Sequence, residues 1–267
     1  MGNQLFEYAA ARGLAARLGV EVSVDERMLA RMNDAPARPH FAWRVVEPER
    51  LPPFRWDRPT AYFLWRYLGL SPKIRRERGH HPNFLTWPDD SYLHGYWQHE
   101  GYFAHIADEL RRECRVTTPP SAANQKFAAR ITGCLSASLH VRRGDFLDVA
   151  PDAVCTEHYY RTALDRLAAE IGEMPTVFVF SDDPDWARGN LNLPAETVVV
   201  DINGPDSAHE DLRLMVACRH NIISNSTFSW WGAWLGTPDN RVVIGPKTET
   251  ETISSWLADG WISVLNQ

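Results

Sequence analysis

The second half of the chain alternates short apolar runs with amphipathic segments, and this alternation restricts its possible folds more than any other feature. Strand-like runs occupy residues 136–142, 176–181, 197–201, 221–224 and 241–245. The helix-like segments between them lie at 157–172, around 184–191, and at 210–220 and 229–235. Such alternation predicts right-handed crossovers and a parallel sheet covered by helices. We therefore predict an α/β fold with a Rossmann-like domain in this half.

The first half is less regular. Apolar residues at helical spacing predict a helix over residues 3–19, and alternating valines predict a strand at 20–25. Between residues 35 and 90, many prolines and aromatic residues make the helix and strand periodicity hard to read. Residues 115–125 are the best candidate for a linker, because two prolines and small polar residues interrupt the pattern there. We therefore expect an N-terminal domain over residues 1–118 and a C-terminal domain over residues 119–267.

Bulk composition excludes several classes of function. The formal net charge of −6 argues against a general nucleic-acid binder, which needs a basic surface to follow phosphates. The four cysteines have no metal-ligand spacing, so we expect buried free thiols. No apolar run approaches the roughly 20 residues of a membrane-spanning helix, and no secretory signal pattern opens the chain. These features predict a cytoplasmic protein with no integral membrane segment, and leave open a peripheral association with the inner membrane.

Polar residues follow three of the predicted strands where each strand ends. Arg142, Arg143, Gly144 and Asp145 follow the first, residues 181–183 follow the second, and residues 224–227 follow a later one. In parallel sheets ligands bind at these carboxyl ends. Guanidinium groups match phosphate oxygens in paired hydrogen bonds, and a helix start attracts anions. The three clusters together predict a nucleotide-diphosphate site.

Each cluster also has a simpler interpretation. The arginine pair is typical of a solvated surface with Asp145 as its ionic partner, and residues 224–227 are typical of a helix cap. His140 suits a hydrogen-bonded core position, and the tryptophans at 230–234 suit a core. The coincidence of three polar clusters at three strand ends favours the binding site.

Five segments resemble the α-1,2-fucosyltransferase family of inverting, GDP-fucose-dependent enzymes. They read HVRRGDF, VFVFSDDPDW, HNIISNSTFSWWGAWLG, MGNQLFEYAAARGLA and GYWQHEGYF, at residues 140–146, 177–186, 220–236, 1–15 and 95–103. They occur in family order over nearly the whole chain. The resemblance implies a GT-B-like fold, with two Rossmann-like domains facing across a cleft and no required metal.

The resemblance also implies roles for individual residues. Arg142 would contact the β-phosphate of GDP-fucose and stabilise the leaving group, and Arg143 would support that site or the acceptor side. The remaining donor-binding residues would be Asn3, His140, Asp182 at the guanine, and Ser226, Thr227 and Phe228 along the diphosphate and base. For the catalytic base we name Asp145, with His99 and Glu100 as alternatives, although Asp145 could equally orient an arginine.

The acceptor implied by the resemblance is a terminal galactoside, fucosylated at its 2-hydroxyl, in a bacterial surface glycan or a lipid-linked oligosaccharide. Tyr96, Trp97 and Gln98 are candidates to line its site, and the same aromatic residues could equally form core.

Two other functions are weighed against this one. Asp183 and Asp185 have the Asp-x-Asp spacing with which many glycosyltransferases hold a divalent metal, although Arg142 and Arg143 already supply positive charge and Asp185 could simply start a helix. A non-catalytic module that binds a sugar nucleotide or a glycan is the other alternative.

The opening of the chain departs from the family pattern. Family members begin with an apolar strand before Gly-Gly-x-Gly-Asn-Gln, whereas Gly2-Asn3-Gln4 directly follows Met1 here. The expectation from the resemblance is that the first strand of the N-terminal domain is missing and that the native polypeptide begins upstream.

Overall fold

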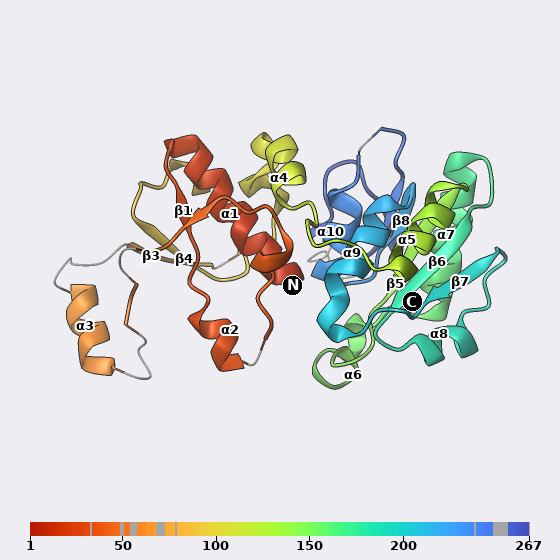
Figure 1. Ribbon diagram of the computed structural model, residues 1–267, viewed down its shortest axis with the longest axis horizontal. Coiled ribbons are helices and arrows are strands. Elements are labelled where there is room, and N and C mark those ends of the chain that lie inside the picture. The colour runs from red at the N-terminus through yellow and green to blue at the C-terminus, as the bar shows by residue number, and fades with distance from the viewer. Residues whose placement is uncertain are drawn as a thin grey trace. The chain divides into compact units, whose positions relative to one another are not determined.

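The computed structural model describes residues 1–32, 34–48, 51–53, 58–67, 73–77, 79–237, 239–247 and 256–266 (Figure 1). The chain divides into two compact units. The C-terminal unit comprises Met1–Gly2, Pro39–Phe41 and Cys114–Gln267, and the N-terminal unit comprises Asn3–Arg38 and Ala42–Glu113. The domain limits drawn from the sequence, 1–118 and 119–267, remain predictions.

The C-terminal unit is built on a six-stranded sheet in which every neighbouring pair is parallel. Its strand order is β10-β9-β8-β5-β6-β7, the order of a Rossmann sheet. The strands are β5 (Ser136–Val141), β6 (Thr176–Ser181), β7 (Thr197–Val200), β8 (His220–Ile222), β9 (Val243–Lys247) and β10 (Ile262–Leu265). The predicted α/β fold class is therefore confirmed.

Helices connect these strands. They are α5 (Ala122–Thr132), α6 (Phe146–Val149), α7 (Glu157–Ile171), α8 (Pro184–Asn190), α9 (Ala208–Ala217) and α10 (Thr227–Trp234). Helix α7 packs on β8, β9 and β10, whereas α9 packs between α5 and α10. Leu164 and Leu167 on α7 are fully buried beside Leu139 of β5, as their spacing predicts. Burial of each such side chain contributes about 1.5–3 kcal/mol.

The structure corrects two sequence-based boundaries and adds one strand. The predicted linker at 115–125 ends in the first turn of α5, because Ser121 caps that helix by accepting a hydrogen bond from the backbone N–H of Asn124. The helix predicted over 210–220 ends at Ala217, since the chain becomes extended at Cys218 and His220 already begins β8. Strand β10, a half-buried four-residue strand at the edge of the sheet, was not predicted, although three of its four residues are apolar.

The N-terminal unit contains short elements around one long helix. They are α1 (Gly2–Leu18), β1 (Val22–Ser23), α2 (Arg27–Met32), β2 (Val45–Val46), α3 (Pro59–Tyr67), β3 (Lys73–Arg76), β4 (Ser91–His94) and α4 (Ala107–Glu113). The predicted helix at 3–19 is confirmed and stops at Gly19, whose φ of 71° favours glycine. Strands β1 and β2 pair in parallel, as do β3 and β4. Among the described residues no helix is long and apolar enough to cross a membrane.

Candidate functional site

The candidate site lies at the carboxyl ends of β5 and β8, which are neighbours in the middle of the sheet. From this pair the chain builds outward in two directions, to β6 and β7 on one side and to β9 and β10 on the other. Such a switch point is where open α/β sheets bind ligands, because the loops after the two strands diverge there. The three polar clusters predicted from the sequence follow β5, β6 and β8, so the sheet places them along one edge.

Arg142 is held between two carboxylates. Its Nη1 lies 3.0 Å from Asp182 Oδ2, and its Nη2 donates a hydrogen bond of 2.6 Å to Asp145 Oδ1. The side chain remains about one-third exposed, so the guanidinium is oriented by protein and still reachable from solvent. Asp145 therefore orients Arg142, one of the two roles that the sequence left open, and its role as a proton acceptor stays a prediction.

Asp182 organises the turn after β5. Its Oδ1 accepts a hydrogen bond of 2.9 Å from the backbone N–H of Arg143. A Cβ at Gly144 would lie 2.6 Å from its Oδ2, so the turn needs glycine at this position. The sequence did not identify this carboxylate as an anchor of the turn at residues 142–144, here called the arginine turn. Its predicted contact with guanine stays a prediction.

Arg143 lies over the indole ring of Trp186, with its guanidinium carbon 4.1 Å from the ring centroid. Its Nε is 3.5 Å from Asp183 Oδ2 and is buried without a hydrogen-bond partner. A cation over an aromatic face is attracted by the ring's electrons, which holds the guanidinium at this position. Trp186 belongs to the segment VFVFSDDPDW, but sequence reasoning assigned it no role.

The Asp-x-Asp pair has other partners in the structure. Asp183 is the N-cap of α8 and accepts a hydrogen bond of 3.1 Å from the backbone N–H of Trp186. Asp185 is exposed and pairs with Arg188 at 2.9 Å. Asp183, rather than Asp185, therefore starts the helix. Among the described residues, no group of three or more His, Cys, Asp or Glu side chains is placed to hold a metal ion.

The loop after β8 is joined to β5 by a buried hydrogen bond of 2.9 Å between His140 Nδ1 and Ser224 Oγ. Burial, reinforced by the nearby charge of Arg142, lowers the pKa of His140 to about 3. This imidazole is therefore neutral at physiological pH. The hydroxyl of Tyr159 on α7 donates a 2.6 Å hydrogen bond to the carbonyl of Ile223, and this bond also holds the loop after β8 in place.

Helix α10 begins in this loop and has a glycine packed against its first residues. Ser226 is the N-cap and accepts a hydrogen bond of 3.3 Å from the backbone N–H of Phe228. A Cβ at Gly2 would lie 2.5 Å from Thr227 Oγ1 and 2.6 Å from the nitrogen of Phe228, so only glycine fits. The ring of Phe228 is 5.6 Å from that of His140. The structure thus gathers His140, Ser226, Thr227 and Phe228, and adds Gly2, which the sequence argument did not single out.

The remaining predicted residues lie in the N-terminal unit. Asn3 accepts a hydrogen bond of 3.0 Å from Gln98 Nε2, and Tyr96 is half exposed. Trp97 is fully buried against Phe84 and Tyr102. Its side chain therefore forms core instead of lining an acceptor site. The sequence could not show which of the two adjacent aromatic residues is buried, because Tyr96 and Trp97 are similar in type and differ only in their surroundings in the fold.

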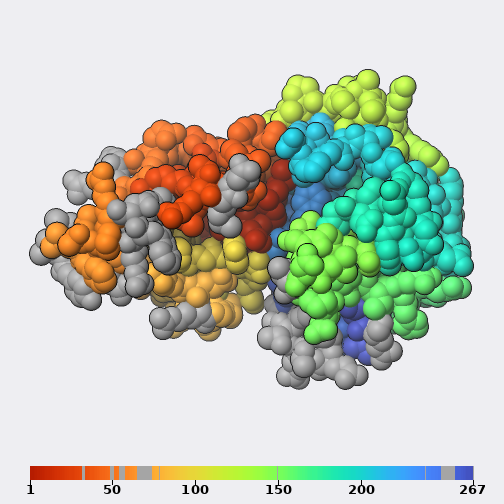
Figure 2. Space-filling model, turned by 90° about the horizontal axis from the view of Figure 1, so that it is seen from below, coloured from red at the N-terminus to blue at the C-terminus, as the bar shows by residue number. Residues whose placement is uncertain are grey.

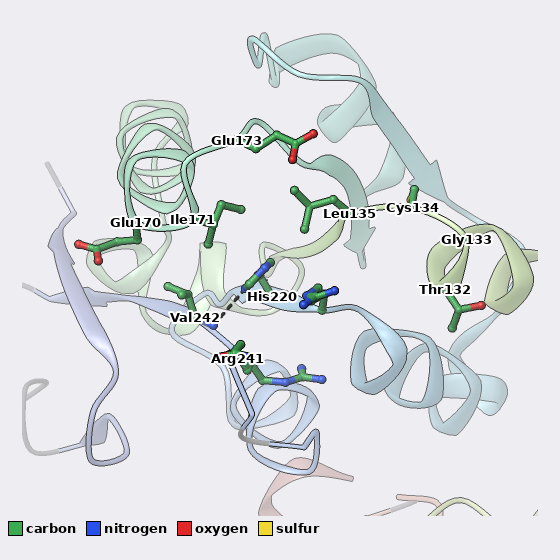
Figure 3. A pocket seen from close by; sticks show the side chains of 12 residues that line it. Thr132, Gly133, Cys134, Leu135, Glu170, Ile171, Glu173, His220, Arg241 and Val242 are labelled. Atoms are coloured by element: carbon green, nitrogen blue, oxygen red, sulfur yellow. Dashed lines mark hydrogen bonds between the residues drawn. The ribbon is translucent and has the colours of Figure 1, made fainter.

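A separate hollow of about 790 Å³ lies at the opposite edge of the sheet, near the amino ends of β5, β8 and β9 (Figure 3). It is lined by residues such as Leu135, Ile171, His220 and Val242. The backbone N–H of Val242 donates a 3.1 Å hydrogen bond to His220 Nδ1 across its floor. None of the predicted site residues lines this hollow, so it is distinct from the candidate site.

Comparison with known families supports the resemblance seen in the sequence. Residues 70–264 match the family described as "Glycosyl transferase family 11". An alpha-1,2-colitosyltransferase of Escherichia coli is 32% identical over an alignment covering 64% of this chain and 61% of that protein. Galactoside alpha-(1,2)-fucosyltransferase 2 of Rattus norvegicus is 28% identical, with 90% of this chain and 65% of that protein covered. The chain thus spans less than two thirds of the length of either relative.

The ADP-heptose LPS heptosyltransferase II of E. coli aligns over 97% of this chain and 86% of its own, with 13% identity and a TM-score of 0.44.

Proposed function

The chain belongs to glycosyl transferase family 11, and on this premise we propose that it transfers fucose from GDP-fucose to the 2-hydroxyl of a terminal galactoside, with inversion and without a metal. The observation that carries the proposal is the position of Arg142. This guanidinium is fixed by Asp145 and Asp182 at the switch point of a Rossmann sheet and remains partly exposed. A phosphate could reach it, because two carboxylates orient the guanidinium while about one-third of the side chain stays exposed.

The donor would lie with its diphosphate between the arginine turn and the start of α10. Arg142 would bind the β-phosphate and Arg143, held on Trp186, would support it. The start of α10 would add the partial positive charge of a helix N-terminus. His140, being neutral, would contribute hydrogen bonding and shape to this site.

In the reaction, the acceptor oxygen forms a bond to C1 of fucose as the bond from C1 to the β-phosphate oxygen breaks on the opposite face. The electron pair of the broken bond stays on GDP, and the acceptor proton passes to Asp145 or to solvent. Negative charge therefore grows on the β-phosphate, where fixed donors stabilise the transition state more than the ground state. Arg142 would have this role.

Metal independence is part of the proposal. A bound divalent ion and a pair of arginines supply the same positive charge to a diphosphate. Arg142 and Arg143 supply it here, and the capping of α8 by Asp183 and the pairing of Asp185 with Arg188 give the Asp-x-Asp residues other roles.

The similarity to an alpha-1,2-colitosyltransferase favours a second candidate, in which colitose replaces fucose in the donor. The acceptor in either case would be a galactose-terminated glycan or a lipid-linked oligosaccharide, used in the cytoplasm during synthesis of a bacterial surface glycan.

A transfer assay tests the proposal. Purified protein is incubated with GDP-fucose or GDP-colitose and a panel of galactosides, with and without EDTA, and product linkage is determined by NMR. We expect α-1,2-linked product, undiminished by EDTA. Activity lost to EDTA and restored by manganese would instead indicate a metal-dependent enzyme that uses Asp183 and Asp185. Tight GDP binding with no transfer to any galactoside would instead favour a non-catalytic binding module.

A further inference from the structure

The first turn of α7 contains two adjacent tyrosines, Tyr159 and Tyr160, and both are fully buried. Helix α7 connects the parallel strands β5 and β6, so its first turn lies at the carboxyl edge of the sheet, the edge of the candidate site. The exposed residues that follow β5 appear in green at the surface of the C-terminal unit in Figure 2. The two tyrosines have no exposed surface at this edge, so they can act on a ligand only through other residues.

The hydroxyl groups of the two tyrosines have different surroundings. Tyr159 donates its 2.6 Å hydrogen bond to the carbonyl of Ile223, a residue that is itself buried. The hydroxyl of Tyr160 faces the sulfur of Cys155 and has no nitrogen or oxygen partner among the described residues. Of the two hydroxyl groups, that of Tyr159 therefore bonds the loop after β8.

Cys155, just before the N-cap of α7, holds the same loop at a second point. Its sulfur accepts a hydrogen bond from the backbone N–H of Asn225. Burial raises the pKa of this thiol to about 12, so the thiol stays protonated and is a poor nucleophile. Tyr159 and Cys155 thus hold the loop on both sides of Ser224, the residue that is hydrogen-bonded to His140.

From these contacts we propose that Tyr159 is a positioning residue for the donor diphosphate, and that it acts through the loop leading into α10. The inference rests on the proposed function, because it requires the start of α10 to bind a phosphate. A buried carbonyl without a donor is costly, so loss of the tyrosine hydroxyl lets Ile223 turn toward another partner. Ser226, the N-cap of α10, then leaves its position in part of the molecules. The apparent affinity for the donor falls with the fraction of molecules that are ready to bind it.

Two measurements on the full chain test the proposal. Hydrogen exchange without ligand, read by mass spectrometry, reports the opening of residues 223–228, from the end of β8 to the first turn of α10. Isothermal titration calorimetry with GDP reports the donor affinity. Tyr159→Phe keeps the ring and removes only the hydroxyl. We expect faster exchange in this segment and a Kd for GDP about tenfold higher, which corresponds to ~1.4 kcal/mol, the worth of one hydrogen bond.

Steady-state kinetics distinguish positioning from a direct role in the reaction. In Tyr159→Phe the KM for GDP-fucose should rise by a similar factor, while kcat should stay within about twofold of wild type, because the buried hydroxyl touches no reacting atom.

Two substitutions on the same helix are the controls. Tyr160→Phe removes an equally buried hydroxyl that does not bond the loop, and should keep the exchange rates and the Kd of wild type. Leu167→Val removes one methylene from a fully buried core position and should lower the melting temperature by a few degrees without changing the Kd. The second control separates a general loss of stability from a displaced loop.

Three results would overturn the inference while leaving the proposed function intact. They are wild-type exchange of residues 223–228 in Tyr159→Phe, wild-type affinity for GDP in that variant, and an equal rise of the Kd in Leu167→Val. A wild-type protein that binds no GDP would overturn the proposed function, and the role of Tyr159 in donor binding with it. In that case faster exchange in Tyr159→Phe would still show that this hydroxyl holds the loop.

Discussion

Gly144 lies so close to Asp182 that a Cβ on the glycine would approach Oδ2 to 2.6 Å. The same carboxylate oxygen is 3.0 Å from Nη1 of Arg142. Because Gly144 has no side chain, Asp182 can lie close enough to form the ion pair that orients Arg142, two residues before the glycine. This relationship makes the arginine turn sensitive to substitutions that add very little volume.

Gly144→Ala should lower kcat/KM for donor by at least about tenfold, because Asp182 must move and Arg142 loses one of its two ionic partners. The matched control is Gly189→Ala on α8, where an added Cβ meets nothing within 4 Å. That control should keep full activity and gain about 0.4–1 kcal/mol of stability. Steady-state kinetics and chemical denaturation of both variants make the comparison. Equal activity of the two alanine variants would contradict the proposed arrangement.

Arg142→Ala should reduce turnover by a factor of about 100 or more, corresponding to roughly 3 kcal/mol of transition-state stabilisation. Arg142→Lys should recover only part of it, since an ammonium cannot contact Asp145, Asp182 and a phosphate in one plane. Arg166→Ala on α7, which removes a surface arginine paired with Glu170, is the control. Single-turnover rates at saturating donor give the measurement. An Arg142→Ala variant with more than half of wild-type turnover would refute the leaving-group role.

Trp186→Leu should raise the KM for donor by about twofold to thirtyfold while leaving kcat nearly unchanged. The variant removes the aromatic face under Arg143, an interaction of about 0.5–2 kcal/mol. Trp186→Phe keeps a face and should restore most of the affinity. Initial-rate kinetics separate the two parameters. A fall in kcat with unchanged KM in the leucine variant would mean that Arg143 acts in the chemical step.

Asp185→Asn should leave turnover within about twofold of wild type, because this exposed carboxylate pairs with Arg188 and such pairs contribute little. Asp183→Ala should instead cost about 0.5–2 kcal/mol of stability through loss of the α8 cap, and Asp183→Asn should retain it. Activity assays with EDTA and thermal unfolding distinguish these effects. Loss of activity in Asp185→Asn, with rescue by added metal, would support a metal site.

The buried imidazole of His140 should make stability fall on acidification. Its pKa is lowered to about 3 in the folded chain from 6.5, so between these values the unfolded chain binds a proton that the folded chain does not. The contribution of His140 to the free energy of unfolding is complete above pH 6.5. Between pH 6.5 and about pH 3 it declines by about 1.4 kcal/mol per pH unit. In His140→Asn this contribution is absent, so the stability difference from wild type should narrow by about 2 kcal/mol between pH 7 and pH 5. Urea unfolding at both pH values measures it, and a constant difference would contradict the neutral, buried state.

Much of the C-terminal fold follows from local sequence patterns. Helix α7 begins after Thr156, whose side chain accepts a hydrogen bond from the backbone N–H of Tyr159, and ends at Gly172 with φ of 77°. Both signals are local, so its limits could be predicted. Strands β5 and β6 are central and buried, and their apolar runs are equally clear. Strand β10 was missed although three of its four residues are apolar, because a run of only four residues carries little periodicity.

The sequence alone determined which polar groups gather at the edge of the sheet, because strand ends are set by local patterns and parallel strands bring their carboxyl ends together. It did not determine what each group does there. Only the tertiary structure decided that Asp182 anchors the arginine turn, that Asp183 caps α8, and that Trp97 is core while Tyr96 is exposed. Side-chain partners depend on distances between residues far apart in the chain, and such distances exist only once the strands are paired and the helices are packed.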